Sequence, residues 1–148
     1  MAGKPTISPN IRANLEQGDD SRGGRPEVIL EILFDRGLLF LCVNNIGDRP
    51  ATKVSVRFNK KILGPDGSKD ISALPLFRNI EFMGPGREIT TLLDTTSSYF
   101  KRKQPTAISV QVSYSDAEGR SFEATINHDL EIYRDLAFVT SSRSQTAD

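Results

Sequence analysis

From Glu27 onward, apolar and polar residues alternate along the chain. Val28, Leu30, Ile32 and Phe34 share one parity, and the turn residues 35–37 follow them directly. Because successive side chains of a strand point to opposite faces, this period of two predicts a strand with one buried face. The same period recurs in three later segments that we expect to be strands, at residues 54–58, 108–114 and 122–128.

Other segments depart from simple alternation. Leu38–Val43 is apolar on both parities, which predicts a strand covered on both faces. Residues 60–72 contain a Gly-Pro-Asp-Gly turn and predict a long loop, whereas residues 76–82 show no clear type. Residues 88–93 follow Gly-Pro-Gly and predict a further strand. Asp94 is expected to cap a single helical turn, with Tyr99 and Phe100 returning to the core.

These elements predict an all-β fold. About seven short strands without alternating helices favour an immunoglobulin-like antiparallel β-sandwich over a parallel sheet. We assign the sandwich to residues 27–140, a flexible N-terminal arm to 1–26 and a C-terminal tail to 141–148. Within the arm, Ser8-Pro9 favours a short helix with Ile11 and Leu15 on one side. That helix would dock on a partner or cover an edge of its own sheet.

Composition narrows the setting and the partners. The 148 residues include 19 basic and 19 acidic ones, so the net charge is zero. The chain lacks the basic excess that usually accompanies binding to nucleic acid. With Cys42 as the only cysteine, an intrachain disulfide is excluded. The start of the chain lacks the apolar stretch of a signal peptide, and the longest apolar run, Leu38–Val43, is too short to span a bilayer. We therefore expect a cytoplasmic protein without membrane contact.

Residues capable of catalysis are scarce. His128 is the only histidine, and it shares the inward parity of Phe122, Ala124 and Ile126, which is typical of a structural histidine. Cys42 lies within an apolar strand, where a thiol is normally an inert buried group. The acidic residues show no metal-ligand spacing. We expect no enzyme activity, cofactor or metal.

One basic run could bind a partner. Lys101-Arg102-Lys103 directly follows Tyr99 and Phe100, and cations beside aromatic rings can hold single-stranded nucleic acid. In the competing interpretation, the aromatic residues close the end of the sandwich while the cations stay in solvent. The candidate partner-binding residues are Tyr99, Lys101, Arg102, Lys103, Lys60 and Lys61.

The turns resemble those of a known family. Residues 43–51 (VNNIGDRPA), followed by Val54 and Val56, resemble the "V-x-N-x-G … A-x-x-V-x-V" signature of CARDB-type bacterial immunoglobulin-like domains. Gly84-Pro85-Gly86 is similar to that family's "L-x-P-G" turn, and Tyr114, Asp116 and Gly119 match its closing hairpin. The resemblance spans about residues 28–133. It implies an immunoglobulin-like fold and no catalytic residues, whereas the absence of an export signal departs from the family's extracellular setting.

The function that these observations favour is non-catalytic binding of another protein. An edge strand, or the long loops at residues 62–71 and 94–104, would contact the partner. Phe77 and Tyr99 are candidate aromatic anchors, with core packing as the competing use of each. Nucleic-acid or anionic-ligand binding through the lysine and arginine residues remains the alternative. A homodimer formed through an edge strand also stays open.

Overall fold

A computed structural model describes residues 24–136 of the chain. The predictions for the N-terminal arm before residue 24, including the helix with Ile11 and Leu15, lie outside the described residues. The predicted tail from residue 141 lies outside them as well.

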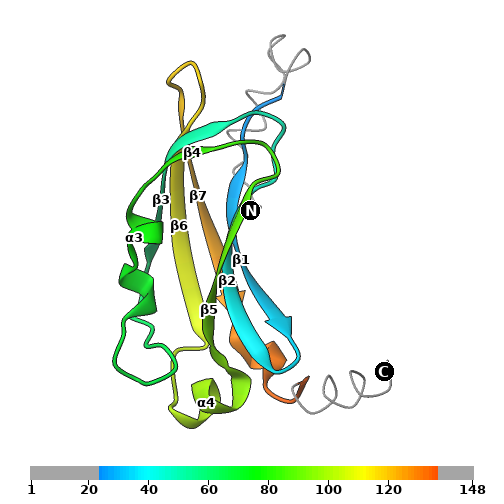
Figure 1. The fold of residues 1–148 in the computed structure, drawn as a ribbon, viewed down its shortest axis with the longest axis vertical. Helices are drawn as coiled ribbons and strands as arrows, with labels where there is room; N and C mark the ends of the chain where they lie inside the picture. The colour runs from blue at the N-terminus through cyan, green and yellow to red at the C-terminus, as the bar shows by residue number, and fades with distance from the viewer. Residues whose placement is uncertain (1–23, 137–148) are drawn as a thin grey trace.

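The described chain folds as an antiparallel β-sandwich (Figure 1). One sheet has three strands in the order β1-β2-β5, and the other has four in the order β4-β3-β6-β7. This arrangement confirms the predicted fold class and every strand proposed from the alternation. The strands are β1 (Val28–Asp35), β2 (Leu38–Asn45), β3 (Ala51–Phe58), β4 (Ile80–Met83), β5 (Glu88–Thr95), β6 (Ala107–Ser115) and β7 (Ser121–Asp129).

Short helices occupy the connections. The segment without a clear sequence type forms η1 (Ile71–Ala73) and α3 (Pro75–Arg78) before β4 begins. Helix α4 (Thr96–Lys101) joins β5 to β6, and η2 (Leu130–Tyr133) follows β7. The prediction that Asp94 caps α4 is wrong, because the hydroxyl of Thr95 accepts the hydrogen bond from Ser98 N–H. A threonine hydroxyl satisfies a free N–H of the first turn as a carboxylate would.

The core lies between the two sheets and uses the predicted parities. In β1 the inward residues Val28, Leu30 and Ile32 are at most 6% exposed. In β6 the inward residues are likewise buried, from Ile108 to Tyr114. The double covering expected for β2 is found in part: Leu39, Leu41 and Val43 face the core, and on the outer face Cys42 is buried while Phe40 is half-buried. Helix α3 packs beside β3, and α4 packs at the end of β5.

Asn45 joins three segments at one end of the sandwich. Its side-chain oxygen accepts hydrogen bonds from the N–H groups of Glu27 and Gly47, at 3.1 and 3.0 Å. Its side-chain nitrogen donates to the carbonyl oxygens of Arg49 and Met83, at 2.9 and 3.1 Å. Gly47 is needed beside it, since a Cβ there would lie 2.3 Å from the carbonyl oxygen of Arg25. The Asn-x-Gly motif is therefore a tertiary connection as well as a turn.

Candidate functional site

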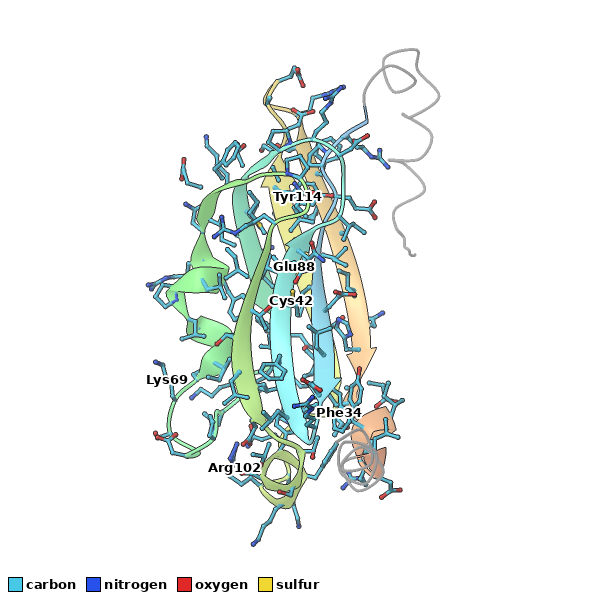
Figure 2. The ribbon with its side chains drawn as sticks, turned by 45° about the vertical axis from the view of Figure 1, so that its right-hand side comes forward. Phe34, Cys42, Lys69, Glu88, Arg102 and Tyr114 are labelled. Carbon is cyan, nitrogen blue, oxygen red and sulfur yellow. The ribbon has the colours of Figure 1, made fainter. Side chains whose placement is uncertain are left out.

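The two predicted binding loops adjoin at the end of the sandwich that carries α4. The side chain of Arg102 donates hydrogen bonds to the carbonyl oxygens of Leu63 and Pro65, at 3.0 and 3.1 Å. Its guanidinium also lies 2.8 Å from the carboxylate of Asp94, whose side chain is 1% exposed. Arg102 therefore connects β5, α4 and the loop before η1 (Figure 2).

The six predicted site residues separate into exposed and buried ones. Lys60, Lys61, Lys101 and Lys103 are exposed, whereas Arg102 points into the loop contacts just described. Tyr99 is fully buried, and its hydroxyl donates to the carbonyl oxygen of Pro105. Burial and the nearby charge of Asp94 both raise the pKa of Tyr99. The structure thus places four lysines at the surface and uses the tyrosine in the core.

The other candidate anchor is also a core residue. Phe77 in α3 is 1% exposed and meets the ring of Phe58 edge-on, with the ring centres 5.0 Å apart. Edge-to-face contact is a favoured geometry for buried aromatic pairs. Phe77 therefore fastens α3 to the end of β3.

His128 and Cys42 occupy structural positions. The Nε2 atom of His128 lies 2.9 Å from the carbonyl oxygen of Leu30 in the opposite sheet. A carbonyl only accepts, so this nitrogen carries the proton, and burial lowers the pKa of the ring. Cys42 is 1% exposed, and burial raises the pKa of its thiol. Neither environment favours the reactive form of its side chain.

Potential metal ligands do not converge in the described chain. Within residues 24–136, no group of three or more histidine, cysteine, aspartate or glutamate side chains is placed to hold a metal ion. None of the helices described there is long and apolar enough to cross a membrane.

The outer faces of the two sheets differ in polarity. In the four-stranded sheet, β3, β6 and β7 present polar side chains outward, with Phe82 of the short edge strand β4 as an exposed exception. A sheet with one buried face normally has such a polar second face. The outward residues of these three strands include Ser55, Arg57, Ser109, Gln111, Ser113, Glu123, Thr125 and Asn127.

The three-stranded sheet instead carries an apolar row on its outer face. Leu33 of β1 is paired with Phe40 of β2, and Phe40 is paired with Leu92 of β5. Leu33 and Leu92 are 37% and 41% exposed. Their neighbours along the strands, Ile32 and Leu93, point into the core, so the row must point outward. We refer to Leu33, Phe40 and Leu92 as the apolar row.

The surroundings of the apolar row are acidic. On the same face, the pair next to Leu33–Phe40 places Glu31 opposite Cys42, and Glu88 lies opposite Asn44, two outward pairs from Phe40–Leu92. No lysine or arginine occupies the outward positions between these two glutamates and the apolar row, which are residues 31–33 of β1, 40–44 of β2 and 88–92 of β5. The face therefore combines exposed apolar surface with negative charge. Figure 2 shows Cys42 on the central strand of this sheet, with Glu88 near it on β5.

The two edges of this sheet are not equivalent. Along β1, the His128 ring binds the carbonyl of Leu30, and the Tyr133 hydroxyl donates to the carbonyl of Ile32 at 3.2 Å. Strand β5 pairs with β2 on one side and with no strand of residues 24–136 on the other. Between Glu88 and Asp94 it carries no lysine or proline, the residues that commonly protect an edge. The β5 edge is therefore open beside Leu92.

Sequence reasoning missed the apolar row, although a signal was present. Leu33 and Leu92 lie off the inward parity of their strands, and the doubly apolar Leu38–Val43 segment lies between them in the sheet. Together these three exceptions to alternation mark one surface. Recognising it requires the pairing of the strands, which alternation within each strand does not reveal.

The fold and its surfaces define an immunoglobulin-like β-sandwich with one apolar, acidic outer face. The chain matches the family described as "Domain of unknown function (DUF8453)" over residues 8–134, and it belongs to that family. No curated protein and no solved structure matches it. The resemblance of its turns to CARDB-type domains stays a prediction.

Proposed function

We propose that this protein is a non-catalytic interaction module that binds a segment of another protein at the apolar row and the open edge of β5. The observation that carries the proposal is the apolar row, in which the exposed Leu33 and Leu92 flank the half-buried Phe40, in contrast to the polar outer face of the other sheet. Exposed apolar patches that interrupt a polar surface commonly mark interaction sites.

The size of the apolar row indicates how the partner binds. Covering the exposed part of each side chain contributes on the order of 1 kcal/mol, or about 3 kcal/mol for the row. Micromolar affinity requires about 8 kcal/mol, so the row alone is insufficient. A partner strand added to β5 would supply main-chain hydrogen bonds, each contributing roughly 1 kcal/mol. We therefore propose an extended partner segment and an affinity in the micromolar range or weaker.

The chemistry of the face specifies the partner further. A strand added beside β5 would point alternate side chains onto the same outer face as Leu92. Apolar side chains would continue the row, and lysine or arginine would lie near Glu88. The partner segment is therefore extended, apolar on one parity and basic at its end. We also propose a cytoplasmic location, because Cys42 is the only cysteine and the sandwich contains no disulfide.

Comparing charge substitutions on the two outer faces tests this proposal. Proteins captured from the host lysate by the wild type are compared with those captured by Leu92→Asp, Leu33→Asp and the control Thr125→Asp. Thr125 is exposed on the polar face. We expect a partner that is retained by the wild type and the control and lost from both leucine variants. Equal capture by all four proteins would place the binding surface elsewhere.

The alternative function is nucleic-acid or anionic-ligand binding. It would use the four exposed lysines at the α4 end, Lys60, Lys61, Lys101 and Lys103. It requires nucleic acid in the captured material, recovered at low salt and lost at high salt. Ultracentrifugation of the purified protein separates a third outcome, a homodimer through β5. Leu92→Asp would dissociate such a dimer, whereas Thr125→Asp would not.

A further inference from the structure

The family to which the chain belongs includes a segment that precedes the sandwich. The family match covers residues 8–134. It stops at Arg134, the residue that directly follows η2, so its C-terminal boundary coincides with the end of a described element. At its other end the match includes 16 residues before Gly24. Residues 8–23 therefore belong to the same domain as the sandwich, and we refer to residues 8–15 as the arm segment.

The arm segment combines apolar residues with one positive charge. Ile11 and Leu15 are four residues apart, a spacing that places both on one side of a helix. Arg12 is the only charged residue between positions 8 and 15. The acidic residues that precede Gly24 all lie in the connecting residues 16–23. The arm segment is therefore apolar on one side and basic.

The outer face of the three-stranded sheet is complementary to the arm segment. Leu33 and Leu92 of the apolar row provide exposed apolar surface. Glu31 is the next outward residue to Leu33 on β1 and adds negative charge to the same face. The outer face of β3, β6 and β7 is polar and suits an apolar segment less well.

The connecting residues are long enough for the arm segment to reach the apolar row. The described chain begins at the end of the sandwich away from α4 (Figure 1). Leu15 and Leu33 are each nine residues from Gly24, on opposite sides of it in the sequence. Because nine residues of nearly extended chain span about 30 Å, a chain that reverses near Gly24 brings Leu15 to the level of Leu33.

We propose that the arm segment covers the apolar row of its own chain when no partner is bound. Ile11 and Leu15 lie against the row in this arrangement. Arg12 then lies near Glu31, where the opposite charges attract. The partner binds only by displacing the arm segment, which makes this contact autoinhibitory. The displacement rests on the proposed function, whereas the covering of the row does not.

Charge substitutions in the ¹⁵N-labelled full chain test whether the arm segment covers the row. Ile11→Asp and Leu15→Asp should release it, and the control Ala13→Asp adds the same charge on the opposite side of the predicted helix. We expect the first two variants, but not the control, to shift the NMR signals of the amides in residues 31–33, 40–42 and 90–92. Shift changes confined to residues before Gly24, or equal in all three variants, would overturn the proposal.

A synthetic peptide of residues 4–17 supplies the arm segment as a separate molecule. It is added to the Ile11→Asp protein at millimolar concentration, which matches the effective concentration of a segment on a short linker. The shifted signals should return toward their wild-type positions. The same peptide carrying Ile11→Asp should leave them unchanged. An equal response to both peptides, or no response to either, would overturn a direct contact with the row.

Two further measurements identify the occupant and test its displacement. Signals of the row that change with the concentration of the wild-type protein would show a second copy of the chain on the row and overturn the proposal. Ile11→Asp should retain the partner on the order of tenfold more strongly than the wild type, as expected if the arm segment covers the row in about nine molecules of ten. Equal retention would overturn the displacement. If the arm segment covers the row and neither protein retains a partner that depends on Leu92, the proposed function fails and the covering of the row stands.

Discussion

Arg102 and Asp94 form an ion pair of 2.8 Å in which the aspartate side chain is 1% exposed and the arginine side chain 23% exposed. The pair lies where β5 leads into α4, and the same guanidinium binds the carbonyl oxygens of Leu63 and Pro65. A residue that the sequence places in a solvent-exposed basic run therefore holds two loops together.

Replacing Arg102 should destabilise the fold. Arg102→Met leaves the carboxylate of Asp94 buried without its partner, a change that typically costs about 3–5 kcal/mol. Urea unfolding monitored by circular dichroism measures the loss. The exposed neighbours provide the control, since Lys101→Met and Lys103→Met should change the free energy of unfolding by less than about 0.5 kcal/mol. Equal effects of all three substitutions would contradict a structural role for the ion pair.

Asn45 should be the most sensitive asparagine of β2. Asn45→Ala removes the acceptor for two backbone N–H groups and the donor to two carbonyls, and we expect a loss of about 3 kcal/mol or more. Its neighbour Asn44 points to the outer face and is half-buried. Asn44→Ala should therefore cost less than about 1 kcal/mol. Equilibrium unfolding of both variants under identical conditions gives the comparison.

His128 should make stability depend on pH near neutrality. Burial lowers its pKa below the usual 6.5, so the unfolded chain takes up the proton first as the pH falls. The stability gained from keeping His128 neutral is fully present above about pH 6.5. It declines below that pH until the histidine of the folded protein also becomes protonated. His128→Gln removes the titrating group. The difference in unfolding free energy between wild type and variant should therefore change between neutral and mildly acidic pH, and a constant difference would contradict the assignment.

The β1–β2 turn offers a stabilising substitution. Arg36 has φ of 52°, a left-handed conformation that favours asparagine or glycine, and Gly37 follows with φ of 81°. We expect Arg36→Asn to raise the free energy of unfolding by about 0.5 kcal/mol, because asparagine tolerates this backbone better. Arg49 is also exposed, but its φ is not positive. Thermal unfolding of the two variants and the wild type gives the comparison, and Arg49→Asn should have no stabilising effect.

Two arrangements could not be predicted from the sequence for the same reason. Leu33, Phe40 and Leu92 become neighbours only through the pairing of three strands. Arg102 meets the carbonyl oxygens of Leu63 and Pro65 only because the loop before η1 folds against α4. The off-parity leucines are visible within their strands, but neither meeting is, since each joins residues far apart in the chain.

The sequence by itself determined the strands, most turns and the side chains that face the core. Alternation with a period of two is a local property, and burial of one sheet face imposes it on each strand separately. The tertiary structure alone decided which outward residues adjoin, that Arg102 turns inward, and that the outer faces differ in polarity. Those outcomes depend on strand register and loop packing, which arise from contacts between distant segments.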